Sequence, residues 1–328
     1  MKTKVIFFNQ WRNGDCFIGK EYVREIVKMF PDIEFAYAHN NFPDIIGDLK
    51  IKHMTLDEIP RKGMFTLVDV VPEVDGGRTI YINTWAGCLI PKYMGEKDHA
   101  NFKLLHNLWR EIYQALNVEI GESFEDYLPQ IKWEHYDLSE CDEYLKRIDN
   151  KRLFLFCNSP QQSEQSSMGD MRDIIYQLAT EHNDCEFLVT DELDFDLPNV
   201  TYCGTKTRDM NASNVIFGPM IVGSLNKISY ISQHAELIVG KNSGPFTYAH
   251  TKFNMGDPNK TFMCFSHKLK DCLMGEGEYY ADSYFSDTLD NDIAIRILNS
   301  LINTELELSS GNKKPTREFQ MTWAKQST

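Results

Sequence analysis

The amino-acid sequence predicts an α/β protein of two domains, each built around a parallel β-sheet. The chain has 328 residues, about twice the common size of a single domain. Short apolar segments typical of strands alternate with amphipathic segments of helical spacing. Near residues 134–152 a highly charged stretch interrupts this alternation, which then starts again. The restart indicates a second domain.

Composition and charge exclude several classes of protein. Hydrophobic residues make up 42% of the chain, which is enough apolar material to fold both domains. The formal net charge of −14 argues against nonspecific binding to nucleic acid, which requires a basic surface. The eight cysteines form no CxxC pair and no zinc-finger spacing. No stretch approaches the roughly 18 apolar residues of a membrane span. We therefore expect a cytoplasmic protein with no transmembrane segment and at most peripheral membrane contact.

The first domain is predicted to span residues 1–145 and to begin with a βαβ unit. A short apolar strand at 4–8 precedes a polar loop, an amphipathic helix at 16–30 and a second strand at 31–40. This order implies parallel strands joined by a right-handed crossover. Two further strands and a long amphipathic helix are expected at residues 64–71, 78–85 and 99–117.

The second domain is predicted to span residues 152–308, followed by a polar tail at 309–328. Strands are expected at 152–159, 185–191, 199–204, 236–243 and 260–266. Helices are expected at 171–183, 224–235, 246–253 and 290–308, the last one packing back across the space between the domains. Three apolar side chains of the tail are candidates for docking on the domain: Phe319, Met321 and Trp323.

Two Rossmann-like domains that face each other define a cleft between the carboxyl ends of their sheets. Open α/β sheets bind their ligands just outside those strand ends. The residues that directly follow predicted strands are therefore the candidates for a functional site.

One such segment is the peptide IVGKNSGPFTYAHT at residues 238–251, in which a polar loop joins a strand to a helix. Ser243 is suited to cap the helix, and Gly244 allows close approach of a ligand to the backbone. The backbone N–H groups of Phe246 and Thr247 would then be available to an anion such as a phosphate. An ordinary capped helix without any ligand is the alternative interpretation.

The longer peptide SYISQHAELIVGKNSGPFTYAHT at 229–251 carries a family resemblance. It resembles the carboxyl-half signature of the ADP-heptose:lipopolysaccharide heptosyltransferases, a group of GT-B glycosyltransferases. The family's acidic residue is Asn242 here, and its histidine is Thr247. The resemblance implies that this loop holds the diphosphate and nearby sugar hydroxyls of a nucleotide-sugar donor. The residues that match the signature at its spacing are Ser243, Gly244, Pro245 and Ala249.

A second similarity to the same family lies near the amino terminus. Gly14 and Asp15 match the family's Gly-Asp pair, and residues 30–31 match its Phe-Pro pair, although the proline of the first helical turns is missing. We expect Asp15 to face the cleft and to take the proton from the acceptor hydroxyl as a general base. The alternative is a carboxylate that only caps its helix. Arg12 and Asn13 beside it are candidates for binding acceptor charge or donor phosphate.

Polar residues elsewhere in the second domain are further candidates for the donor site. Lys206 and Arg208 are cations that suit a diphosphate, although lone cations in loops are commonly solvated. The loop after the strand at 152–159 lacks the family's Lys-Trp pair, and a simple hydrophilic loop explains it equally well. Its candidate donor-binding residues are Asn158, Ser159, Gln161 and Gln162.

The resemblance implies a GT-B fold and a glycosyltransferase of lipopolysaccharide or other surface-glycan biosynthesis. The expected reaction moves a sugar, such as a heptose, from a nucleotide-diphosphate donor to a hydroxyl of a glycan or glycolipid by inverting displacement. The nucleotide sugar is a co-substrate, and neither a cofactor nor a metal is expected, because helix N–H groups would stabilise the leaving diphosphate. The alternatives are a nucleotide-sugar epimerase, a fucosyltransferase-like GT-B enzyme and a non-catalytic GT-B-like binding protein.

Overall fold

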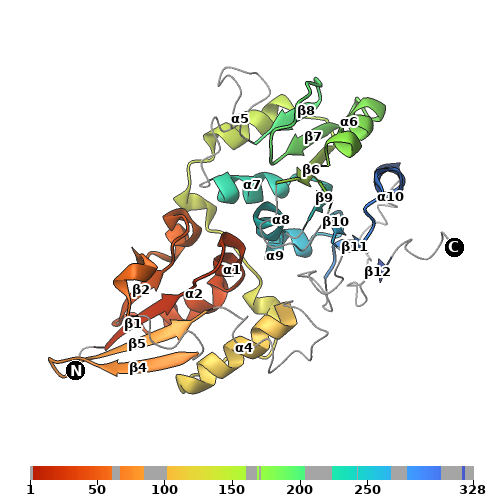
Figure 1. The fold of residues 1–328 in the computed structure, drawn as a ribbon. Coiled ribbons are helices and arrows are strands. Elements are labelled where there is room, and N and C mark those ends of the chain that lie inside the picture. The colour runs from red at the N-terminus through yellow and green to blue at the C-terminus, as the bar shows by residue number, and fades with distance from the viewer. Residues whose placement is uncertain are drawn as a thin grey trace. The chain divides into compact units, whose positions relative to one another are not determined.

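The computed structural model divides the chain into two compact units, Met1–His135 and Tyr136–Thr328, which are coloured from red to yellow and from green to blue in Figure 1. Five of the predicted site residues lie outside the described residues: Gln161, Gln162, Lys206, Arg208 and Asn242. The predicted cleft between the domains stays a prediction. The structure describes residues 3–60, 67–84, 102–159, 168–169, 171–203, 224–241, 243–266, 279–303 and 320–321.

The first unit contains a five-stranded sheet in the order β3-β2-β1-β5-β4. Strands β1, β2, β3 and β5 are parallel, but β4 runs antiparallel to β5. The prediction of a fully parallel sheet is therefore wrong at this edge. The short turn at 73–77, with Gly76 at φ 81°, joins β4 to β5 as a hairpin, whereas parallel strands require a long crossover. The strands are β1 (Thr3–Phe8), β2 (Glu34–Ala38), β3 (Lys52–Met54), β4 (Val68–Pro72) and β5 (Arg78–Asn83).

The predicted βαβ unit at the start of the chain is confirmed, but its helix is broken at Gly19 into α1 (Asn13–Ile18) and α2 (Lys20–Met29). A Cβ atom at Gly19 would lie 3.3 Å from the Trp109 ring of α4 (Phe102–Ala115), so α4 packs closely at the break. Tyr22 of α2 stacks on the same ring, with 4.9 Å between the ring centroids. Short 3₁₀ helices complete the unit: η1 (Pro43–Leu49), η2 (Leu56–Glu58), η4 (Phe124–Tyr127) and η5 (Trp133–His135).

A fully buried ionic cluster fixes α2 to η1. Lys20 Nζ lies 3.0 Å from Asp48 Oδ1, and both side chains have no exposed surface. Arg24 donates to Asp48 Oδ2 at 2.8 Å and also pairs with Glu21 at 3.0 Å. Asp48 therefore balances the charges of two buried cations.

The second unit contains a seven-stranded sheet in the order β12-β11-β10-β9-β6-β7-β8, and every pair is parallel. Counted from β6, this order is 3-2-1-4-5-6-7, which extends the 3-2-1-4-5-6 order of dinucleotide-binding folds. The predicted Rossmann-like domain is confirmed, although β11 and β12 were not expected as strands. The strands are β6 (Leu153–Cys157), β7 (Glu186–Val189), β8 (Val200–Tyr202), β9 (Leu237–Gly240), β10 (Thr261–Phe265), β11 (Asp282–Ser286) and β12 (Gln320–Met321).

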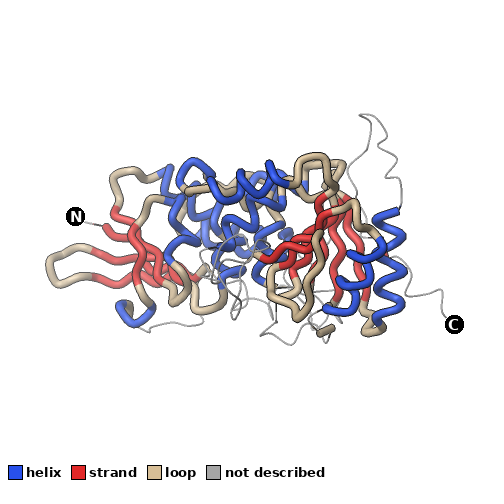
Figure 2. Tube along the Cα trace, turned by 90° about the horizontal axis from the view of Figure 1, so that it is seen from above, coloured by secondary structure: helices blue, strands red, loops and turns tan. Residues whose placement is uncertain are grey.

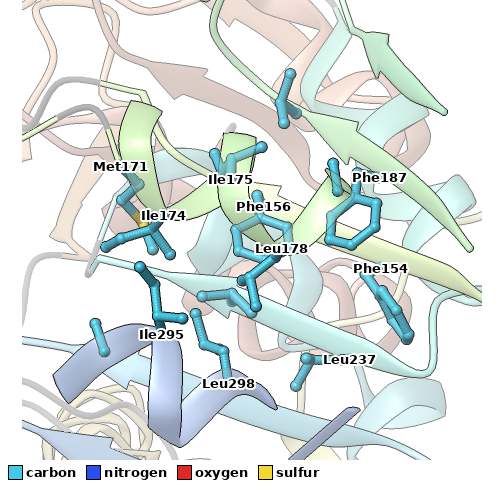
Figure 3. Close-up of a cluster of buried hydrophobic side chains, with 14 of the residues drawn as sticks. Phe154, Phe156, Met171, Ile174, Ile175, Leu178, Phe187, Leu237, Ile295 and Leu298 are labelled. Atoms are coloured by element: carbon cyan, nitrogen blue, oxygen red, sulfur yellow. The ribbon is translucent and has the colours of Figure 1, made fainter. Parts of the chain in front are cut away.

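One face of this sheet is covered by α6 (Arg172–Glu181) and α10 (Asn291–Asn303), as Figure 2 shows. Asn299 of α10 bonds to Glu181 of α6 at 2.7 Å and to His182 at 2.6 Å. The last helix therefore packs on its own sheet, because its apolar stripe is needed to cover the core. The prediction that it packs back across the cleft is wrong. Figure 3 shows the core side chains from the strands and both helices, among them Phe154, Phe156, Ile174, Ile175, Leu178, Phe187, Leu237, Ile295 and Leu298.

The opposite face carries α8 (Gly244–Ala249), whose Phe246 ring packs edge-on against Phe262 of β10. The helix predicted at 246–253 is in fact α8 and α9 (Lys252–Met255), separated at His250.

Two side-chain bonds, Glu140–Lys227 at 2.7 Å and Asp142–Tyr230 at 2.9 Å, join α5 (Ser139–Arg147) to α7 (Ser224–Ser232). These bonds place α5 in the second unit, so the division lies before the predicted junction.

Within the described ranges, none of the helices combines the length and apolar content that a membrane crossing requires. The same part of the chain brings no three His, Cys, Asp or Glu side chains together in a way that suits a metal ion.

Candidate functional site

The candidate site lies at the carboxyl edge of the second sheet, between β6 and β9. The strand order reverses between these two neighbours, and Cys157 at the end of β6 pairs with Gly240 at the end of β9. The segments that begin with Asn158 and Lys241 therefore leave the sheet side by side. Open α/β sheets bind their ligands at such a reversal. The structure thus brings together two segments that were selected from the sequence for separate reasons.

On the β6 side, Asn158 is fully buried and holds the loop after β7. Its Oδ1 accepts hydrogen bonds from the backbone N–H groups of Thr190 at 3.0 Å and Asp191 at 2.8 Å, and its Nδ2 donates to the Asp191 carbonyl at 3.1 Å. Ser159 Oγ lies 2.9 Å from Thr190 Oγ1. Asn158 therefore shapes this edge, and Ser159 is the first hydroxyl that the edge presents beyond it.

On the β9 side, Ser243 precedes α8 in extended backbone geometry, but its hydroxyl does not cap the helix. Only 7% of the residue is exposed, and Ser243 Oγ has no hydrogen-bond partner within the part of the chain that the structure describes. The Thr247 N–H donates to the Ser243 carbonyl at 2.8 Å. The predictions of a capping Ser243 side chain and an available Thr247 N–H are therefore wrong. A buried hydroxyl without a partner calls for an explanation, and a ligand is one.

Two glycines of this loop serve different purposes. A Cβ atom at Gly240 would lie 2.5 Å from Phe246 Cδ2, so α8 packs directly against the end of β9. A Cβ atom at Gly244 would meet no described atom within 4 Å. No described residue therefore fills the space in front of the first residue of α8, beside Ser243, and Pro245 occupies the first helical turn as predicted.

Side chains hold the far end of α8 in place. Ser229 Oγ donates to the Tyr248 carbonyl at 2.6 Å, and Asn254 Nδ2 donates to the Ala249 carbonyl at 2.9 Å. His250 Nδ1 lies 2.8 Å from the Phe246 carbonyl. Burial lowers the pKa of His250 to about 4, so the ring is neutral near pH 7 and Nδ1–H is the donor. These bonds satisfy the last carbonyls of the helix and fix the loop at its other end.

Lys241 was missed in the sequence analysis. It follows β9 directly and is only 3% exposed, and its Nζ donates to the Gly169 carbonyl at 2.8 Å. The available signal was a lysine placed directly after a continuous apolar strand, where burial is unusual for that residue type.

In the first unit, Asp15 lies in the first turn of α1 and is partly buried. Its Oδ2 accepts the backbone N–H of Arg12 at 3.1 Å. Asp15 therefore takes part in capping from the third helical position, with Arg12 as the N-cap residue, whereas its role as a general base stays a prediction. Arg12 is exposed. Asn13 Oδ1 is buried without a partner among the described residues.

Polar side chains join the strand ends beneath α1. Thr84 Oγ1 lies 2.7 Å from the Tyr37 hydroxyl and accepts from Asn9 Nδ2 at 3.2 Å. Cys16 of α1 is buried, and burial raises the pKa of its thiol to about 12, which keeps it protonated and unsuited as a nucleophile. The chemistry of this edge therefore depends on oxygen and nitrogen groups.

Two exposed aromatic side chains flank the same edge. Trp11 is 45% exposed and Phe42 is 39% exposed. Asn41 Nδ2 donates to the Trp11 carbonyl at 2.9 Å and so ties the loop after β1 to the loop after β2. The aromatic pair therefore lies close to Arg12 and to α1.

No protein-family profile matches this sequence, and no curated protein sequence matches it either. Solved structures similar to this one include a family 9 glycosyltransferase from Veillonella parvula, with 11% identity, coverage of 95% of this chain and 92% of that chain, and a TM-score of 0.49. They also include the E. coli heptosyltransferase WaaC with ADP, with 8% identity, coverage of 92% and 98%, and a TM-score of 0.49. A putative UDP-N-acetylglucosamine 2-epimerase from Listeria monocytogenes shows 8% identity, coverage of 97% and 93%, and a TM-score of 0.47. At such identities the similarity does not extend to substrates or activities.

Proposed function

We propose that the protein is a glycosyltransferase that moves a sugar from a nucleotide-diphosphate donor to a hydroxyl of a glycan or glycolipid. The observation that carries this proposal is the buried hydroxyl of Ser243 at the strand reversal of the second sheet, which has no hydrogen-bond partner among the described residues. An unsatisfied buried polar group costs about 1–3 kcal/mol, and a bound ligand that supplies the missing hydrogen bond removes that cost. The peptide around Ser243 is also the one that resembles the heptosyltransferase signature.

The donor diphosphate would lie against the loop between β9 and α8. Ser243 supplies a hydroxyl, and the space at Gly244, which no described residue fills, lets a phosphate reach the backbone. Groups already fixed in the protein stabilise a leaving diphosphate without reorganising during the reaction. The bonds from Ser229 and Asn254 to the last carbonyls of α8 support this function because they hold the loop still. Ser159, Gln161, Lys206, Arg208 and Asn242 remain proposed donor contacts on the basis of the sequence.

The acceptor would be bound by the first unit. Asp15 is the proposed general base that takes the proton of the acceptor hydroxyl as the new glycosidic bond forms. Its bond from the Arg12 N–H orients the carboxylate. Arg12 suits an acidic group of the acceptor, and the faces of Trp11 and Phe42 suit the C–H groups of sugar rings. The proposed reaction is an inverting displacement without a metal, in cytoplasmic synthesis of lipopolysaccharide or another surface glycan.

Thermal shift and calorimetry with ADP and UDP-N-acetylglucosamine test the donor site. Ser243→Ala is expected to lower the affinity for the nucleotide about tenfold, since it removes one hydrogen bond to a charged group. The same variant is expected to keep or slightly raise the melting temperature, because the hydroxyl has no described partner to lose. The matched control is Ser283→Ala, a buried serine of β11.

Unchanged affinity in Ser243→Ala, or no nucleotide binding at all, would contradict the donor site. Incubation of the bound sugar nucleotide then separates the alternatives. A new sugar nucleotide formed without acceptor indicates an epimerase, and binding without turnover on any glycan acceptor indicates a binding protein.

A further inference from the structure

His39 directly follows β2 at the carboxyl edge of the first sheet and has no exposed surface. The last residues of β1 and β2, Phe8 and Ala38, pair with each other. The backbone N–H of Asn9, the first residue after β1, donates to the Ala38 carbonyl at 3.0 Å. His39 therefore lies beside the loop that leads from β1 into α1.

Hydrogen bonding and burial together determine where His39 carries its hydrogen. Its Nδ1 accepts the backbone N–H of Asn41 at 3.2 Å, so Nδ1 is not protonated. Burial and the neighbouring ring of His53 lower the pKa of His39 to about 4, so the ring is neutral near pH 7 and Nε2 carries the hydrogen. Nε2 has no hydrogen-bond partner among the described residues. A buried N–H donor in this position calls for an acceptor that is not part of the described chain.

His53 shows what a structural histidine does at the same edge. It lies on β3, and its ring centroid is 4.6 Å from that of His39. Its Nε2 lies 3.1 Å from the His39 carbonyl, a bond that fixes the end of β2 to β3. The Nε2 atom of His53 therefore has a partner within the protein, whereas that of His39 is left for a ligand.

Asn13 supplies a complementary acceptor on this edge. It is the first residue of α1, and its Oδ1 is buried without a partner in the described part of the chain. Asn41 Nδ2 donates to the Trp11 carbonyl at 2.9 Å, so the loop that bonds His39 also holds the segment that leads into Asn13. Hydroxyl groups satisfy both a donor and an acceptor, because they accept through oxygen and donate their hydrogen. A phosphate or a carboxylate only accepts.

We propose that His39 is a specificity-determining residue whose Nε2–H donates to a ring hydroxyl of the acceptor sugar. Asn13 accepts from the same hydroxyl or from its neighbour on the ring. This inference rests on the proposed function, which places the acceptor on the first unit. It assigns the acceptor a chemical class, a sugar whose bound ring keeps its hydroxyls free, and it makes His39 a reader of hydroxyls rather than of charge.

The experiment measures which glycans the full chain retains and how tightly. Wild type, His39→Phe and the control His53→Phe are applied with ADP to an array of neutral and acidic surface glycans. Calorimetry then gives the affinity of each protein for the glycan that the wild type retains best. His39→Phe keeps a buried aromatic ring but removes the Nε2–H. It is expected to lower the affinity about 3- to 10-fold, as for one neutral hydrogen bond, and His53→Phe is expected to change it less than about twofold.

A modified ligand tests the chemical class. The same glycan with all its hydroxyls methylated is expected to bind the wild type at least about tenfold more weakly, since methyl ethers have no hydrogen to donate to Asn13. Equal affinity for the methylated and the free glycan overturns the inference.

The outcomes separate the inference from the proposed function. Equal affinity of the wild type and His39→Phe overturns the role of His39. An equal loss in His39→Phe and His53→Phe also overturns it, because it shows that both rings only support the edge. A wild type that binds ADP but retains no glycan overturns the inference and leaves the donor site standing. A wild type that retains a glycan through His39 but binds no nucleotide supports the His39 contact and overturns the proposed function.

A second measurement applies if His39→Phe does not fold. Long-range ¹H–¹⁵N spectra of the wild type labelled with ¹⁵N-histidine are recorded with and without the retained glycan, and His39→Gln identifies the signals of His39. A shift of the Nε2 signal of His39 on addition of the glycan supports the proposal, and an unshifted signal at saturating glycan overturns it.

Discussion

Gly240→Ala is expected to destabilise the second unit and to displace the loop that holds Ser243. The new Cβ would lie 2.5 Å from Phe246 Cδ2 and 2.9 Å from Phe246 Cβ, whereas carbon atoms in contact normally lie about 3.5–4.0 Å apart. Rotation of the ring cannot relieve the contact with Phe246 Cβ, so the α8 backbone has to move by about 1 Å. Overpacking of this kind costs about 1–3 kcal/mol.

Thermal unfolding followed by circular dichroism measures this effect. A loss of 2 kcal/mol corresponds to a fall in Tm of about 4–8 °C for a unit of this size. The matched control is Gly244→Ala, whose Cβ meets no described atom and which is expected to change stability by less than about 0.5 kcal/mol. Gly244→Ala should nevertheless weaken nucleotide binding, since the methyl group enters the space left for the ligand. A Gly240→Ala variant as stable as the wild type would refute the packing argument.

Two further predictions concern buried titratable groups. The pKa of His250 is about 4 in the folded protein, against an ordinary value of 6.5. The neutral ring therefore contributes about 3 kcal/mol to the free energy of unfolding above pH 6.5, and this contribution is lost as the pH falls towards 4. His250→Asn, compared with the wild type in urea titrations at pH 7 and pH 4, should remove that part of the pH dependence, and parallel pH profiles would contradict the assignment. Asp48→Asn leaves Lys20 and Arg24 buried without their shared counter-charge and is expected to cost about 3–5 kcal/mol in chemical denaturation. Glu25→Gln breaks only the exposed pair with Lys28 and should cost less than about 1 kcal/mol, and similar losses in the two variants would argue against the buried cluster.

The sequence predicted most strands and helices because their apolar spacing is strong. Residues 5–8 and 153–157 are short continuous apolar runs typical of buried strands, and the structure has β1 and β6 there. The segment DSYFS of β11 mixes polar and aromatic residues, so its pairing with β10 depends on the rest of the sheet. The direction of β4 depends on a turn geometry at Gly76 that the residue pattern alone does not determine.

The location of the candidate site was predictable, whereas the behaviour of its side chains was not. Parallel strands place the residues that follow them at one edge, so Ser159 and Ser243 were selected correctly for that edge. Ser243 is a residue type that usually caps a helix, but whether its hydroxyl does so depends on backbone and rotamer details. The burial of Lys241 likewise depends on the segment before α6, which lies far away in the chain.

The pairing of β6 with β9 has a consequence for how the second unit acquires its site. Cys157 and Gly240 are neighbours in the sheet, but two strands and two helices of the described residues lie between them along the chain. Contacts of such long sequence separation require closing a large loop, and they form slowly compared with local helices. A chain that has made α6 and β7 but has not yet inserted β9 lacks the edge that forms the proposed donor site. Nucleotide binding during refolding should therefore appear only with the insertion of β9, after most of the helical signal has returned.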